Sequence, residues 1–83
     1  MVEQKNFNIY YENITLGKLE LGENSNIFDL YKFLQSSNHF SNLSIESIAY
    51  IITINDINRY KNLWEQIKKK ESIKIVFNIG YHD

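Results

Sequence analysis

The fold is decided by residues 6–16, which read NFNIYYENITL. Apolar and polar side chains alternate along the first part of this stretch, a period of two that is typical of a strand with one buried face. Because Asn tolerates positive φ, Glu12-Asn13 predicts a tight turn into a second strand. An N-terminal β-hairpin is therefore predicted. Its inward-facing side chains would be Phe7, Ile9, Tyr11, Ile14 and Leu16.

Outward from the hairpin, the next predicted features are a bulge and a helix. The apolar side chains of the second strand change parity at Gly17-Lys18, and a β-bulge at that point would restore their phase. Asn26 is a good N-cap residue and Asp29 follows in the first turn, so a helix is predicted over Asn26–Ser36. The core stripe of this helix would be Ile27, Leu30, Tyr31 and Leu34.

The second half of the chain is interpreted as a strand-helix-strand unit. Ser47–Thr53 reads SIAYIIT, an apolar run rich in β-branched residues, which predicts a central strand. Asn55-Asp56 would cap a second helix that ends at Lys68–Lys70, and residues 73–79 alternate as a fourth strand. The second helix would bury Ile57, Tyr60, Leu63, Trp64 and Ile67.

These elements predict an α+β fold in a single domain over residues 1–83, since the chain has no proline, linker or internal repeat. The simplest architecture is two-layer: a four-stranded mixed sheet in the order ββαβαβ, with two helices packed mainly on one face. The last two strands should be parallel, because a helix connects them. Such a fold does not by itself imply a function.

Composition limits the classes of function. With 9 Lys and Arg against 10 Asp and Glu, the chain carries no overall field that would draw it to nucleic acid or anionic lipid. The absence of cysteine excludes disulfides and thiolate metal sites, and together with the lack of a leader or a long apolar run it predicts a cytoplasmic protein with no membrane partner. The abundance of Ile, Asn and Lys, which have AT-rich codons, suggests a low-GC bacterium or one of its phages or mobile elements.

No catalytic, metal or cofactor site is predicted. His39 lies in a polar connection and His82 is the penultimate residue, where solvated side chains are the rule. Gly17, Gly22 and Gly80 are too scattered for a phosphate-binding loop. We therefore expect a protein that is not an enzyme and needs no cofactor.

Five aromatic residues lack a clear position in the predicted core, and exposed aromatic side chains favour interfaces. An open edge of the first or fourth strand could add a second route to a partner. We therefore predict a small protein-binding module, a stoichiometric inhibitor or regulator, whose partner is another protein or a second copy of itself. In the competing interpretation Phe28 and Phe40 complete the core and Tyr10 packs on the outer face of the hairpin. The five residues are Tyr10, Phe28, Phe33, Phe40 and Tyr81.

The alternative function is nucleic-acid binding through the basic end of the second predicted helix. Basic groups near aromatic side chains can hold single strands. A lysine run that closes a helix is, however, most often a surface that complements the helix dipole, and the net charge is -1. The residues concerned are Lys68, Lys69, Lys70 and Lys74.

Overall fold

The computed structural model describes residues 2–78 and confirms the N-terminal hairpin. Strand β1 spans Gln4–Tyr11 and pairs antiparallel with β2, which spans Ile14–Gly22. The connecting turn differs from the expectation in one respect, because Glu12, at φ 56°, occupies the left-handed conformation expected of Asn13.

Strand β2 contains the predicted bulge, slightly earlier than Gly17-Lys18. Ile9 pairs with Gly17 whereas Tyr10 pairs with Thr15, so Leu16 is the extra residue. Gly17 has φ 138°, a conformation that residues with a side chain rarely adopt. A Cβ added there would lie 3.6 Å from Cζ of Phe33, so the Phe33 ring packs against this glycine.

The sheet has four strands in the order β2-β1-β4-β3, where β3 spans Ile52–Ile54 and β4 spans Ser72–Phe77. Strand β4 is parallel to β1 and antiparallel to β3. The prediction of an α+β, four-stranded mixed sheet is therefore confirmed, but the prediction that the last two strands are parallel is wrong. The open edges belong to β2 and β3 rather than to the first and fourth strands.

Helix α1, Ile27–Gln35, agrees with the predicted helix. Asn26 Oδ1 accepts a hydrogen bond from Phe28 N at 2.9 Å, and Asp29 Oδ2 accepts one from Asn26 N at 2.9 Å; Asn26 and Asp29 form a capping box. Most of its predicted stripe is buried, namely Leu30, Tyr31 and Leu34.

The predicted strand Ser47–Thr53 is wrong over most of its length, because α2 spans Ile45–Ile51. Ser44 caps this helix by accepting a hydrogen bond from Ser47 N at 3.2 Å. A helix places Ile48 fully inside the core, where a strand would have put it on the same face as the exposed Tyr50. Of this segment only Ile52–Ile54 forms a strand, at an edge and not at the centre, so the element order within residues 2–78 is ββααβαβ with three helices.

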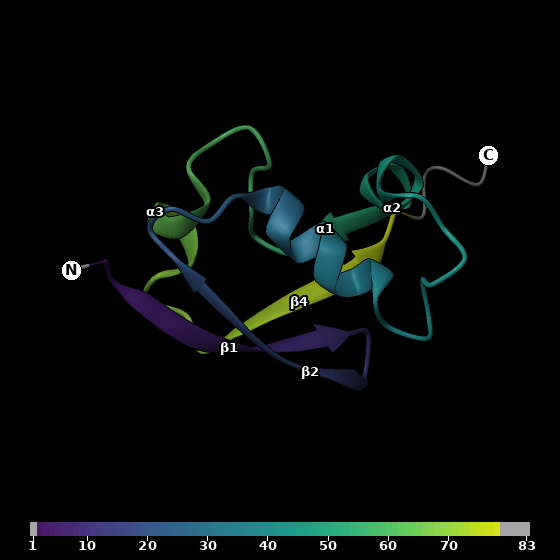
Figure 1. Cartoon of the computed structure of the whole chain (residues 1–83), viewed down its shortest axis with the longest axis horizontal. Helices are drawn as coiled ribbons and strands as arrows, with labels where there is room; N and C mark the ends of the chain where they lie inside the picture. The colour runs from purple at the N-terminus through teal and green to yellow at the C-terminus, as the bar shows by residue number, and fades with distance from the viewer. Residues whose placement is uncertain (1, 79–83) are drawn as a thin grey trace.

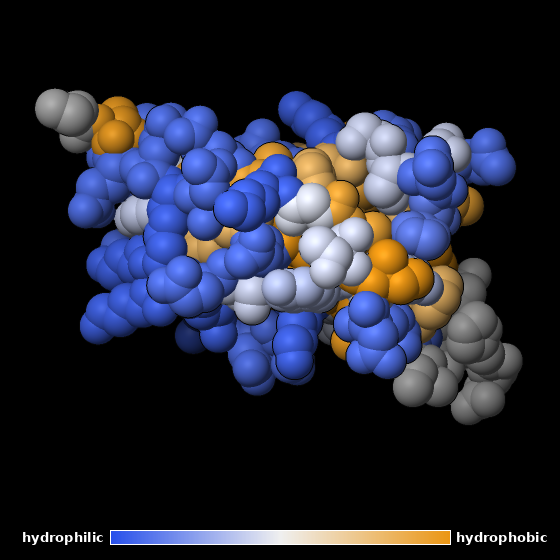
Figure 2. All heavy atoms as spheres, turned by 90° about the horizontal axis from the view of Figure 1, so that it is seen from below, coloured by the Kyte–Doolittle hydropathy of each residue, from blue (hydrophilic) through white to orange (hydrophobic). Residues whose placement is uncertain are grey.

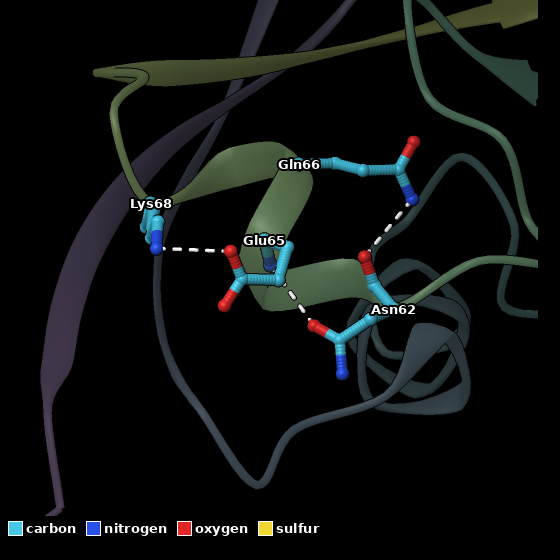
Figure 3. Close-up of polar contacts among 4 residues, drawn as sticks. All are labelled: Asn62, Glu65, Gln66 and Lys68. Atoms are coloured by element: carbon cyan, nitrogen blue, oxygen red, sulfur yellow. Dashed lines mark hydrogen bonds and ion pairs between the residues drawn. The ribbon is translucent and has the colours of Figure 1, made fainter.

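The second predicted helix is also shorter than expected, since α3 spans only Leu63–Ile67. Asp56, at φ 64°, cannot continue a right-handed helix, and Asn58 Oδ1 accepts a hydrogen bond from Tyr60 N at 2.9 Å within a turn. The N-cap is Asn62, whose Oδ1 accepts a hydrogen bond from Glu65 N at 2.9 Å (Figure 3). Residues 55–62 are thus a loop, named here the 55–62 loop.

Helices α1 and α2 lie over one side of the sheet, and α3 lies at the end nearest the N-terminus (Figure 1). Between the helices and the sheet is one apolar core, to which every strand and helix contributes. The opposite face of the sheet is lined mainly by polar side chains; Figure 2 shows hydrophilic residues over much of the view, with white and orange, more apolar residues at the centre and to its right. The fully buried side chains include Phe7, Ile9, Leu30, Leu34, Ile48, Ile67 and Ile75.

Candidate functional site

The structure separates the aromatic residues predicted to bind a protein. Phe40 is only 2 % exposed and packs edge-on against Tyr11 at a centroid distance of 5.0 Å, so it belongs to the core. Phe33 is half-buried against Gly17, and Tyr10 is half-buried on the polar face of the sheet. Tyr81 lies outside the described residues. Of the five, Phe28 is the one shown to be largely exposed, at 54 %.

Phe28 occupies the first turn of α1, where the capping box fixes its backbone amide. Its ring meets that of Tyr31, one turn later, at a centroid distance of 5.8 Å and an interplanar angle of 88°. This edge-to-face geometry is favourable for aromatic pairs and holds the exposed ring on a buried one. Phe28 is therefore a positioned side chain with half of its surface open to solvent.

Two residues of the 55–62 loop interact electrostatically with Tyr31. The guanidinium of Arg59 and the hydroxyl of Tyr60 are both near enough to Tyr31 to act on its pKa. Burial raises the pKa of Tyr31, Arg59 opposes that rise, and Tyr60 adds to it. Tyr60 is 89 % exposed, although the sequence predicted it to be a core residue. We name the exposed residues Phe28, Arg59 and Tyr60, together with the buried Tyr31 that supports the Phe28 ring, the aromatic-arginine surface.

Hydrogen bonds hold the loop that carries Arg59 and Tyr60. Arg59 Nη2 donates to the carbonyl oxygen of Ala49 at 2.8 Å and to that of Ile52 at 3.5 Å, which ties the loop to the end of α2. Gln66 ties it to α3: its Nε2 donates to the carbonyl oxygens of Asn58 at 2.9 Å and of Asn62 at 3.1 Å (Figure 3 shows the second of these). The exposed tyrosine thus projects from an anchored loop.

Sequence reasoning missed Arg59 and Tyr60 because it placed them in a helix. A signal was present in the asparagines at positions 55, 58 and 62, since Asn side chains compete with the backbone for hydrogen bonds and favour turns over helix interiors. Had the helix been predicted to begin only after Asn62, Tyr60 would have been assigned to a loop and not to the core stripe.

The lysines of the nucleic-acid alternative do not form one patch. Lys68 Nζ is paired with Glu65 Oε1 at 2.9 Å, and this hydrogen bond is the main reason that its pKa is raised (Figure 3). Lys68 and Lys69 border one depression, whereas Lys70 and Lys74 border another. Acidic side chains share both depressions: Glu3 lies in the first, and Asp56 and Glu71 lie in the second.

Two titratable side chains, His39 and Tyr11, lie side by side. His39 is exposed, and its ring lies 5.8 Å from that of Tyr11, centroid to centroid. Burial is the main cause of the raised pKa of Tyr11, to which Glu12 adds. Within residues 2–78, no group of three or more His, Cys, Asp and Glu is placed to hold a metal ion. His82 lies outside the described residues.

In the part of the chain that the structure describes, no helix has both the length and the apolar character needed to cross a membrane. The chain was compared with protein-family models, with curated proteins and with solved structures, and none of the three comparisons found a match.

Proposed function

We propose that this protein is a small, non-enzymatic binding module that acts stoichiometrically on another protein, as an inhibitor or regulator. The observation that carries the proposal is the aromatic-arginine surface, where Phe28 is 54 % and Tyr60 is 89 % exposed and where Arg59, next to Tyr60 in the chain, acts electrostatically on Tyr31. Tyr, Trp and Arg are the residue types that contribute most to protein–protein binding energy, and Phe is enriched in interfaces. The surface therefore has the composition of an interface centre.

Preorganisation supports the same conclusion. A side chain that is immobilised only on binding loses entropy at that moment, at a cost of roughly 0.5–1.5 kcal/mol. Arg59 is already held by the carbonyl oxygens of Ala49 and Ile52, and Phe28 already rests on Tyr31. A partner that docks here would meet part of the surface in its binding conformation.

Nucleic-acid binding receives less support. The four lysines of that alternative border two depressions, one of which also holds the carboxylate of Glu3 and the other those of Asp56 and Glu71, and carboxylates repel phosphate. The exposed aromatic side chains Phe28 and Tyr60 come from α1 and the 55–62 loop, not from the lysine run. We retain this function as an outcome that the experiment below can reveal.

The experiment is a capture from a lysate of the source organism on immobilised protein, with nuclease treatment and salt washes, followed by mass spectrometry. Three variants are compared with the wild type: Phe28→Ser, Tyr60→Ser and Tyr10→Ser. Because Tyr60 is almost fully exposed, its replacement should alter the free energy of unfolding by no more than about 0.5 kcal/mol. Tyr10→Ser is the matched control, since that tyrosine lies on the polar sheet face.

We expect one dominant protein that survives nuclease and is bound at near-equal stoichiometry by the wild type and by Tyr10→Ser. Phe28→Ser or Tyr60→Ser should weaken its capture about tenfold or more, as loss of a hot-spot residue does. Equal capture by all four proteins would refute the assignment of the surface. If nuclease or moderate salt abolished the retention of the captured material, nucleic-acid binding would become the better-supported function.

A cytoplasmic location and a phage or mobile-element source belong to this proposal as predictions from composition. They rest on the absence of cysteine and on the abundance of Ile, Asn and Lys. An inhibitor encoded by such an element would act inside the cell on a host protein, which is the setting that the lysate experiment samples.

A further inference from the structure

Strand β2 presents backbone hydrogen-bonding groups at an open edge of the sheet. Glu23 N donates to the carbonyl oxygen of Glu3 at 3.2 Å, so this residue pair is hydrogen-bonded across the hairpin. Bonded and non-bonded pairs alternate in an antiparallel ladder, which makes the pairs of Leu21 and Leu19 with β1 bonded as well. The backbone groups of Lys18, Glu20 and Gly22 consequently point away from β1.

The usable part of this edge is short because both of its ends are closed. At one end, Gly22 N donates to Ser25 Oγ at 2.9 Å and the carbonyl oxygen of Gly22 accepts from Ser25 N at 3.0 Å. At the other end, the bulge at Leu16 interrupts the strand. The amide and carbonyl groups of Lys18 and Glu20 remain, with Leu19 between them.

The charges along this segment are self-complementary. Lys18 and Glu20 are exposed and lie two residues apart, so their side chains project from the same face of the strand. An antiparallel second copy of β2, related by a two-fold axis at Leu19, would place Lys18 opposite Glu20 of that copy, twice in one interface. The neighbouring registers centred on Lys18 or on Glu20 would place like charges opposite one another, which is destabilising.

We propose that the protein forms a two-fold homodimer through antiparallel pairing of β2 with β2 of a second copy, centred on Leu19. The interface is isologous, as a two-fold axis requires, and it joins the two sheets into one. A lysine and a bulge on an edge strand normally discourage pairing, but Glu20 supplies the charge that a second Lys18 can meet. The dimer is weak, because the paired segment is short and interfaces of small area are transient.

This proposal does not depend on the proposed function, because it uses a different surface. We assign the edge of β2 to a second copy of the same chain because the register centred on Leu19 places Lys18 of each copy opposite Glu20 of the other. Any other β-strand would need the complementary pattern, with an acidic residue opposite Lys18 and a basic residue opposite Glu20.

The test is a charge exchange read by analytical ultracentrifugation at low salt. Lys18→Glu and Glu20→Lys each place like charges opposite one another. Each variant alone should therefore dimerise at least about tenfold more weakly than the wild type. An equimolar mixture of the two variants should recover the dimer, because every cross-strand pair then carries opposite charges. The double variant Lys18→Glu/Glu20→Lys should dimerise like the wild type.

Both substitutions are at exposed positions, so circular dichroism and thermal unfolding should show that each variant folds like the wild type. In the wild type, amide exchange at Lys18 and Glu20 should slow as protein concentration rises. A wild type that stays monomeric at millimolar concentration overturns the proposal. So does a dimer that neither single variant weakens, or a mixture that fails to recover it.

Discussion

At the scale of single residues, Gly17 is the position where the backbone most restricts the choice of side chain. The cause is its φ of 138° and not crowding by a neighbour, because an added Cβ would lie 3.6 Å from Cζ of Phe33, which is an ordinary contact distance. Gly17→Ala should therefore lower the free energy of unfolding by about 1–3 kcal/mol, measured by urea denaturation. The cost of Gly17→Ala should be the same in a Phe33→Ala background. If Phe33→Ala removed it, crowding by the ring and not backbone conformation would be the cause.

Tyr31 makes stability sensitive to alkaline pH. Because burial raises its pKa in the folded protein, the folded state keeps the phenolic proton at pH values where the unfolded chain has lost it. Its contribution is thus complete below the unfolded pKa of about 10 and declines as pH rises beyond that value. Thermal melts of wild type and Tyr31→Phe between pH 8 and 11 should show a shallower decline for the variant. Parallel curves would mean that Tyr31 titrates alike in both states.

At the scale of elements, Gln66 joins α3 to the 55–62 loop. Its Oε1 accepts from Asn58 N at 2.8 Å while its Nε2 donates to the carbonyl oxygens of Asn58 and Asn62. Gln66→Glu replaces the donor with an oxygen that repels those carbonyls, so the free energy of unfolding should fall by about 1 kcal/mol or more. Amide exchange at Asn58 should accelerate. The adjacent change Glu65→Gln is the control, because it removes only the surface ion pair with Lys68. Unchanged amide exchange at Asn58 in Gln66→Glu would contradict the idea that Gln66 holds the 55–62 loop.

The same elements show what the sequence could predict. The hairpin, the bulge and α1 follow from local signals: alternation, a parity change at a glycine, and an N-cap residue followed by an acidic residue in the first turn. Helix α2 was mistaken for a strand because its β-branched residues favour strands locally, while the burial of Ile48 and the cap at Ser44 favour a helix. The stripe from Ile57 to Ile67 has helical spacing, but the left-handed Asp56 and the hydrogen bonds of Asn58 and Asn62 convert its first half into a loop.

At the scale of the whole molecule, the α+β class could be predicted but the strand neighbours could not. Alternation along β4 indicates which side chains face the core, and burial of Ile73 and Ile75 agrees with it. Alternation does not indicate which strand lies beside it. Strands β3 and β4 are antiparallel, and the 55–62 loop and the short helix α3 connect them in place of the predicted crossover helix. The candidate site shifted for the same reason, since Arg59 and Tyr60 entered it only when the predicted helix became the 55–62 loop.

The two proposals place function on separate parts of the molecule. The aromatic-arginine surface lies on α1 and the 55–62 loop, whereas the segment proposed to pair with a second copy, residues 18–20, lies on the open edge of β2. Each can therefore be altered alone: Tyr60→Ser should leave self-association unchanged, and Lys18→Glu should leave capture of the protein partner unchanged.

The most direct test of the central claim, that the protein binds another protein through the aromatic-arginine surface, is photo-crosslinking from position 60. A photo-reactive phenylalanine analogue replaces Tyr60, or Tyr10 as the control, and the labelled chain is irradiated in lysate of the source organism after nuclease treatment. We predict one dominant adduct of discrete mass from position 60, identifiable by mass spectrometry as a single protein, and none from position 10. No adduct from position 60, or the same adducts from both positions, would contradict the claim.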